Sequence, residues 1–339
     1  STYNIAVLPA IDPVFNPLSE LMVSFQMRST SDTTSKIVVG VMTDPNDIST
    51  FIPIDTVANS ITGEFELQEI PLNSYTGNAA NVALKLINST NTYSVYLDDV
   101  TLDYIPSCMR PSRPTLTAAT NSSITLSWTP GGNESSWNIE YGTAGFTQGT
   151  GTTMTGVTNP VTISGLSANT DYDFYVQADC GGGDLSQWSM VGSATTECDV
   201  ISQLPYAENF DSYGTGTTAY PICWDKINTY TSGDRPYIKA DGYGSSVGSL
   251  YFFAGSGSYN IGITPEFDAS IPVNTLKANF MYKASSTTYD RLIVGVMSST
   301  TDASTFVPVD TVYPNSTSAS TWVAKEVTFT QYTGNGQYI

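Results

Sequence analysis

The sequence contains no histidine and few charged residues. The absence of histidine from all 339 residues excludes Ser-His-Asp and Cys-His catalysis and the usual histidine-containing zinc sites. Charged residues make up 13%, against about 25% in an average domain. Twelve are Lys or Arg and 31 are Asp or Glu, which gives a net charge of -19. Nucleic acids and anionic membranes bind basic surfaces, so we expect neither as a partner.

Long apolar runs and helical periodicity are also nearly absent. No run approaches the roughly 18 residues of a membrane span, so we expect no membrane insertion. Ser1 opens directly into strand-like sequence, and we expect any targeting segment to lie outside this sequence. Short runs rich in Val, Ile, Thr, Tyr and Phe alternate with clusters of Gly, Pro, Asn and Ser, which is typical of β-sandwiches. The predicted fold class is all-β, with tandem β-sandwiches.

One segment occurs twice, far apart in the chain. IVVGVMTDPNDISTFIPIDTV (Ile37–Val57) recurs as LIVGVMSSTTDASTFVPVDTV (Leu292–Val312), with twelve of twenty-one positions identical. Shorter pairs extend the repeat at separations of 255 to 257: TYNIAVLPAID with SYNIGITPEFD, SFQMR with NFMYK, and YTGN with YTGN. The two ends of the chain are therefore copies of one domain.

Neither copy is whole. The first copy continues to about Ser107, whereas the second ends at Ile339, the equivalent of Val82. The second copy has upstream residues, 199–257, that the first lacks. We predict a C-terminal jelly-roll part at 1–107, a small sandwich at 108–198, and an N-terminal jelly-roll part at 199–339. Partial sandwiches expose strand edges, so we expect neighbouring repeats of the same or another chain to complete them.

Residues 108–198 resemble a fibronectin type III domain. SITLSW (Ser123–Trp128) resembles the second strand, WNIEYG (Trp137–Gly142) the third, and LSANTDYDFYVQA (Leu166–Ala178) the family's Leu-Thr-Tyr-Val-Ala spacing, with Ala168 in place of a proline. The resemblance implies that Trp128, Leu166 and Tyr172 belong to the core. We expect framework packing of Trp137 and Trp188 rather than sugar stacking.

The two end segments resemble one further family. LPYAENFDSY (204–213), PICW (221–224), SLYFFAG (249–255) and YLDDVTL (96–102) are similar to the cleaved-adhesin, MAM-like jelly rolls of Bacteroidetes surface proteins. There these jelly rolls alternate with fibronectin-like modules, as in the haemagglutinin regions of gingipains and in gliding adhesins. The resemblance implies type IX secretion, a cell-surface location, and adhesion to glycans or surface proteins without catalysis.

The same resemblance implies a structural calcium ion. In such jelly rolls, acidic residues near the first strand lie beside paired Asp residues near the last, and calcium is bound by oxygen ligands. The candidates are Glu208, Asp211, Asp98, Asp99, Asp225 and Asp241. The two groups belong to different copies, so each half lacks its partner in this sequence. The alternative is that they are ordinary solvated carboxylates at strand ends.

The four cysteines are Cys108, Cys180, Cys198 and Cys223, and none lies in a CxxC motif. An even number in an exported β-protein favours disulfides over metal or redox sites. We favour Cys108–Cys180, which would join the first strand of the small sandwich to its penultimate strand, together with Cys198–Cys223. Cys180–Cys198 is the alternative.

Three threonines follow an aspartate in triplets that resemble the Bacteroidetes O-glycosylation signal. They are Thr33, Thr56 and Thr311. Thr56 and Thr311 occupy equivalent places in the repeat. Threonine is also common in strands, so the signal is weak.

The function expected from the sequence is a non-catalytic segment of a long extracellular adhesin or filament. The alternative is a carbohydrate-binding accessory region of a secreted hydrolase. A catalytic role for the adjacent pair Asp98 and Asp99 is disfavoured, because neighbouring residues of a strand point to opposite faces and glycoside hydrolysis needs two converging carboxyl groups.

Overall fold

The computed structural model describes residues 4–30, 35–87, 94–231, 233, 235–255, 257–285, 291–314 and 321–339. These residues form strands β1 to β22 and four short 3-10 helices, η1 to η4. No α-helix occurs in the described ranges, and no helix there is long and apolar enough to cross a membrane. The predicted all-β fold class is confirmed.

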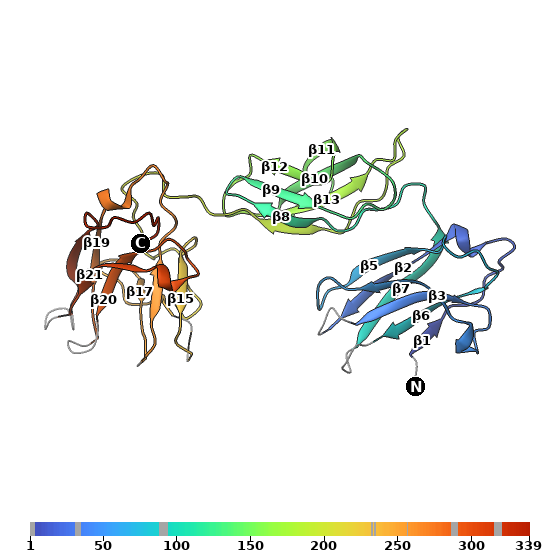
Figure 1. Ribbon diagram of the computed structural model, residues 1–339, viewed down its shortest axis with the longest axis horizontal. Helices are drawn as coiled ribbons and strands as arrows, with labels where there is room; N and C mark the ends of the chain where they lie inside the picture. Colours follow the sequence, from blue (N-terminus) through green and yellow to red (C-terminus); the bar gives the residue numbers. More distant parts are fainter. Residues whose placement is uncertain are drawn as a thin grey trace. The chain divides into compact units, whose positions relative to one another are not determined.

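The first sandwich has two antiparallel sheets (Figure 1). One has the order β1-β6-β3-β4, with bounds Ile5–Val7, Asn81–Ile87, Lys36–Met42 and Ile52–Ala58. The other has the order β5-β2-β7, with bounds Glu66–Pro71, Leu21–Ser29 and Val95–Tyr104. Alternate residues of β2 enter the core between the sheets, where Val23, Phe25 and Met27 are fully buried. This alternation is what a strand with one buried face requires.

The small sandwich follows. Its larger sheet has the order β11-β10-β13-β14, with bounds Thr152–Val157, Trp137–Thr143, Asp171–Ala178 and Gly192–Thr195. Its smaller sheet has the order β12-β9-β8, with bounds Val161–Ser164, Ser123–Ser127 and Thr115–Ala119.

The tryptophans and the other core candidates of the small sandwich have the expected environments. Trp128, Leu166 and Tyr172 are buried. Trp137 is also buried and packs edge-to-face against Trp128, with ring centroids 5.5 Å apart. Trp188 is half-buried. Packing accounts for Trp137, as the sequence suggested.

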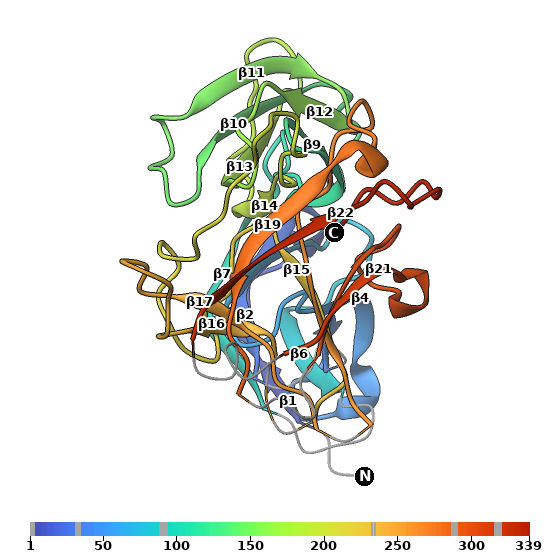
Figure 2. The same cartoon turned by 90° about the vertical axis from the view of Figure 1, so that its left-hand side faces the viewer.

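The described residues of the C-terminal region form four two-stranded sheets. They pair β15 (Asp225–Asn228) with β18 (Asn260–Ile263), β16 (Tyr237–Lys239) with β17 (Ser249–Tyr251), β19 (Lys277–Tyr282) with β22 (Val323–Thr328), and β20 (Leu292–Val296) with β21 (Val307–Val312). Figure 2 shows β19 and β22 side by side. Val296 and Phe329 are fully buried in the core of this region.

The repeated 21-residue segment forms the same structure twice. In the first copy, β3 leads through η2 (Ile48–Thr50) into β4, and Asp47 caps η2 by accepting a hydrogen bond from the Ser49 amide. In the second copy, η4 (Ala303–Thr305) is capped in the same way by Asp302. The variable TDPND and SSTTD residues lie in this loop, so the segment is two core strands and their connection.

A glycine in each copy lies against an aromatic ring. A Cβ on Gly40 would come within 2.6 Å of the Phe51 ring, and one on Gly295 within 2.5 Å of the Phe306 ring. Both glycines stand next to a register shift between the paired strands. The close approach explains why the GVM and STF sequences recur together.

The YTGN motif also has a structural reason. The Tyr75 hydroxyl is 2.9 Å from the Ala79 amide, which donates a hydrogen bond to it, and the Tyr332 hydroxyl accepts from the Gly336 amide at 2.7 Å. Both tyrosine side chains are buried. Each ring lies so close to the glycine of its own motif that a Cβ there would clash with the hydroxyl. The motif therefore closes a turn over the core.

Asp98 and Asp99 do not follow the simple alternation expected of a strand. Between the pairs Gln26–Asp98 and Ser24–Thr101, β2 has one residue and β7 has two. Asp99 has φ 50°, which a bulge residue can adopt. Simple alternation of strand faces therefore does not hold between Asp98 and Asp99, and both side chains are exposed.

Two disulfides form among the four cysteines. Cys108 is bonded to Cys180, and Cys198 to Cys223, which are the two favoured pairs. Cys108 precedes β8, the first strand of the small sandwich, instead of lying within it, and Cys180 follows β13. The first bridge therefore ties the chain entering this sandwich to the end of its penultimate strand.

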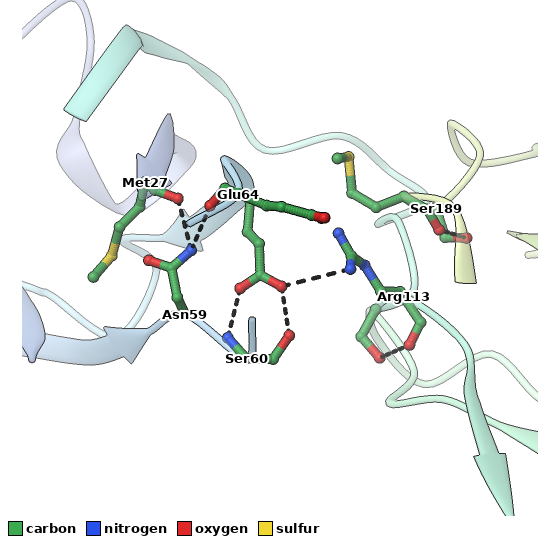
Figure 3. Close-up of polar contacts among 9 residues, drawn as sticks. Met27, Asn59, Ser60, Glu64, Arg113 and Ser189 are labelled. Atoms are coloured by element: carbon green, nitrogen blue, oxygen red, sulfur yellow. Dashed lines mark hydrogen bonds and ion pairs between the residues drawn. The ribbon is translucent and has the colours of Figure 1, made fainter. Parts of the chain in front are cut away.

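A polar cluster lies beside the start of β5 (Figure 3). Asn59 donates to the backbone carbonyls of Met27 and Glu64, at 2.8 and 3.3 Å. The buried Glu66 carboxylate accepts from the backbone amide and hydroxyl of Ser60, and the Arg113 guanidinium lies 3.8 Å from it. These bonds satisfy the Asn59 amide nitrogen and the Glu66 carboxylate, while the buried Asn59 Oδ1 has no hydrogen-bond partner among the described residues.

Candidate functional site

A cation lies between two aromatic rings at one end of the first sandwich. The guanidinium carbon of Arg28 is 4.8 Å from the centre of the Phe65 ring and 4.9 Å from that of Tyr96. Phe65 is 37% exposed and Tyr96 47%. Aromatic and arginine side chains are enriched among the residues that anchor binding partners, so this group is the candidate contact surface of the first sandwich.

The second copy has a related arrangement. The Lys283 ammonium lies 5.2 Å from the centre of the Trp322 ring, and Tyr243 meets that ring edge-on at 6.3 Å. Both carboxylate oxygens of Asp241 accept a hydrogen bond from the same ammonium, each at 2.6 Å. This surface therefore adds a carboxylate acceptor to the rings and the cation.

Strand register creates both arrangements. Met27 of β2 pairs with Glu66 of β5, so the next residue along β2, Arg28, comes to the residue that precedes β5, Phe65. Tyr282 pairs with Val323 in the same way, which brings Lys283 to Trp322. In the first copy, Arg28 also pairs across β7 with Tyr96. We name the two groups, Arg28/Phe65/Tyr96 and Lys283/Trp322/Tyr243/Asp241, the ring–cation surfaces.

These surfaces offer two kinds of contact. The face of an aromatic ring carries negative charge density and holds the cation in place, while the exposed part of the ring offers flat apolar area with little conformational entropy to lose. The Arg28 guanidinium carries several donors in a fixed plane. A flat apolar face beside hydrogen-bonding groups suits a ligand that has both C–H faces and hydroxyl groups.

The sequence motifs did not identify these residues as a site, although aligning the two copies of the repeat pairs them with each other. The alignment of SFQMR with NFMYK already sets Arg28 against Lys283. When the alignment is continued to the next strand with a separation of 257, Phe65 is equivalent to Trp322. A basic residue and an aromatic residue are thus maintained in both copies. Their contact becomes visible only when the register of the two strands is known.

The calcium candidates of the second copy take part in local hydrogen bonds. Asp211 Oδ1 accepts from the Ser246 hydroxyl at 2.5 Å and from the Val247 amide at 2.8 Å, and the Ser246 bond holds the pKa of Asp211 below its usual value. Glu208 accepts from the Phe210 amide and the Tyr213 hydroxyl, each at 2.7 Å. These bonds connect the two carboxylates to neighbouring backbone and hydroxyl groups.

The remaining calcium candidates are distributed over separate elements. Asp98 and Asp99 lie in β7, Asp225 begins β15, and Asp241 is paired with Lys283. The described ranges gather no group of three or more Asp, Glu, Cys or His side chains that could hold a metal ion. These side chains therefore do not fit calcium as placed, and we assign it no role in the chemistry below; structural calcium stays a prediction.

Two of the three glycosylation candidates lie in edge strands. Thr56 is exposed in β4, and Thr311 is half-buried in β21. The backbone amide of each threonine donates to the side chain of the preceding Asp, at 2.6 and 2.7 Å. Each Asp therefore makes a local hydrogen bond to the backbone of its own strand. Thr33 lies outside the described residues.

The middle of the chain matches a known family. Residues 109–194 match the fibronectin type III domain, and this segment is a fibronectin type III domain. Such domains are generally non-catalytic. The domain and the two disulfides are typical of extracellular proteins, while the resemblance of the end segments to adhesin jelly rolls rests on their motifs alone.

Solved structures similar to this chain include single domains of the same type. An FN3 domain of human collagen XX is 23% identical, with 27% of this chain and 95% of that chain covered and a TM-score of 0.23. The FN5 domain of Drosophila Lar is 21% identical, with 28% and 100% covered and a TM-score of 0.24. A β-1,2-glucanase from Parabacteroides distasonis is 19% identical, with 53% and 28% covered and a TM-score of 0.23. A comparison with curated proteins gives no match.

Proposed function

We propose that this chain is a non-catalytic segment of a secreted surface adhesin, and that the ring–cation surfaces of its two end domains bind glycans. The observation that carries the proposal is the repetition of a cation against an aromatic ring at one register position in both copies, Phe65 in the first and the half-buried Trp322 in the second. Sugar rings present apolar C–H faces and hydroxyl edges, which match the aromatic faces and the polar groups beside them.

The order of domains along the chain and the disulfides support a role in adhesion. Tandem sandwiches joined to a fibronectin type III domain present the same surface at intervals along a chain, and several weak sites on one chain bind a multivalent target much more tightly than one site does. Disulfides suit an oxidising environment outside the cell. We include export by type IX secretion and an origin in Bacteroidetes in the proposal, on the motifs LPYAENFDSY, PICW and YLDDVTL.

Binding of the labelled full-length chain to an array of glycans tests the proposal. We expect a subset of glycans to retain the wild-type protein. Phe65→Ala combined with Tyr96→Ala should weaken this signal, as should Trp322→Ala combined with Tyr243→Ala. With all four substitutions the signal should disappear.

Matched controls come from exposed aromatic residues outside the surfaces. Phe15 is 77% exposed and Tyr313 is 70% exposed, so Phe15→Ala and Tyr313→Ala remove comparable apolar area elsewhere on each domain. Both should leave binding unchanged. The proposal fails if no glycan is retained, or if the quadruple variant binds as the wild type does.

A further inference from the structure

Two cations and two aromatic rings lie together on one face of the sheet formed by β16 and β17. Arg235, Tyr237 and Lys239 occupy every second position along β16 and the residues that precede it, so they share one face of the strand. Tyr237 pairs across the sheet with Tyr251 of β17, whose side chain therefore lies on the same face. We name Arg235, Tyr237, Lys239 and Tyr251 the cation ladder.

The tyrosine rings of the ladder hold both cations. The Lys239 ammonium is 4.3 Å from the centre of the Tyr251 ring. The guanidinium carbon of Arg235 is 4.5 Å from the centre of the Tyr237 ring and 6.0 Å from that of Tyr251. The two rings meet edge to face, with centroids 5.3 Å apart. Because the face of an aromatic ring attracts a cation at such distances, the two charges are fixed about 13 Å apart along the strand.

The ladder lies on the outer face of its sheet. Ile238, whose side chain points to the opposite face, is fully buried. Lys239 is exposed, while the other three members of the ladder are half-buried. The strands themselves, YIK and SLY, contain no Asp or Glu, although the chain has a net charge of -19. The ladder is thus a local positive surface on an acidic protein, and its charge is complementary to a ligand that carries carboxylates.

The ladder continues into the second ring–cation surface. Lys239 stands two residues before Asp241, and the Asp241 amide donates to the Lys239 carbonyl at 2.8 Å. Asp241 binds Lys283, and Tyr243 meets the Trp322 ring. The short segment that ends the ladder therefore also begins the ring–cation surface, and the Asp241 carboxylate at their junction is already engaged by Lys283.

The chemistry of the ladder suits acidic sugars. Ammonium and guanidinium groups donate strong hydrogen bonds to carboxylates. The tyrosine rings between the two cations offer flat apolar area, which matches the C–H faces of a sugar ring. An acidic peptide would use the cations but would have no such match for the rings.

We propose that the cation ladder extends the second ring–cation surface and gives it a preference for glycans with carboxylate-bearing sugar residues. Carboxylates of the glycan accept hydrogen bonds from Lys239 and Arg235, and its sugar rings contact the tyrosines between them. This inference rests on glycan binding by the second surface, as the proposed function states, and adds the class of glycan.

Binding of paired glycans to the full chain measures this preference. Phe65→Ala with Tyr96→Ala leaves only the second surface to bind. The ligands are carboxylate-bearing glycans, each compared with its own methyl ester, since esterification removes the charge and leaves the sugar unchanged. The acid should bind at least about fivefold more tightly than the ester, because each of two partly exposed ion pairs adds a modest factor.

Charge variants of the ladder, made in the same protein, identify the cations. Lys239→Met with Arg235→Met should bring the affinities of acid and ester to within about twofold of each other, and Lys239→Glu should reverse the preference. Lys239→Arg keeps the charge and should keep the preference. Lys277→Met is the matched control, because it removes a lysine of the same domain that lies outside the ladder, and it should leave the ratio of affinities unchanged.

The possible failures are distinguishable. If no glycan is retained, the proposed function fails and this inference fails with it. If the second surface retains glycans but binds acid and ester equally, or if Lys239→Glu leaves their ratio unchanged, the inference alone is overturned. Poly-glutamate that displaces an acidic glycan as well as the free glycan does would also overturn it, because charge alone would then explain the binding.

Discussion

The disulfide Cys108–Cys180 should account for a large part of the stability of the fibronectin type III domain. It closes a loop with a sequence separation of 72, and Cys198–Cys223 closes one of 25. Restricting the unfolded chain by these loops then contributes about 4.4 kcal/mol for the first bridge and about 3.5 kcal/mol for the second, within a usual range of roughly 2–5 kcal/mol.

The assay is calorimetry of the full chain carrying Cys108→Ser and Cys180→Ser. For a domain of about 90 residues, each kcal/mol moves the melting temperature by roughly 4–8 °C, so the transition of this domain should fall by more than about 10 °C. Cys198→Ser with Cys223→Ser is the matched control and should leave that transition in place. A transition that stays within about 2 °C, or that moves equally in both variants, would show that this disulfide does not stabilise the domain.

Three further predictions concern the end domains. Tyr75→Phe leaves the buried Ala79 amide without its hydroxyl partner and should cost about 1–3 kcal/mol in denaturant unfolding; an unchanged midpoint would contradict the role given to the YTGN turn. The Lys325 ammonium donates to the Asp310 carboxylate at 2.7 Å and lowers the pKa of that carboxyl in the folded protein. The ion pair therefore stabilises the fold fully above the pKa of an unfolded Asp, about 4. This stabilisation is lost as the pH falls through the lowered pKa of Asp310 in the folded protein. Lys325→Met should raise the pKa of Asp310 in a carboxyl NMR titration, while Lys277→Met should not. If calcium is structural, a chelator should lower the melting temperature of a chain spanning one whole period, and no shift would exclude the ion.

The sequence was sufficient for the architecture because the signals were local or repeated. Alternation in LMVSFQMRS predicts a strand with one buried face, and the buried Val23, Phe25 and Met27 confirm it. The cysteine pairing was favoured from domain order alone and agrees with the structure. The boundaries at residues 107 and 198 stay predictions.

Register and backbone conformation set the limits of what could be predicted. The contact of Arg28 with Phe65 depends on which residue of β5 faces Met27, and no single motif fixes that pairing. The bulge at Asp99 depends on one extra residue in β7, which strand periodicity does not reveal. The family resemblance indicated which acidic residues could bind calcium. It could not show that they lie close together, because Glu208 and Asp211 belong to the second copy and Asp98 and Asp99 to the first.

In the proposed function, each copy of the repeated domain carries one glycan-binding surface. Isothermal titration of the full chain with a glycan retained on the array measures this directly. We expect two sites per wild-type chain, one site after Phe65→Ala with Tyr96→Ala, and one after Trp322→Ala with Tyr243→Ala. A stoichiometry that neither pair of substitutions changes would contradict it.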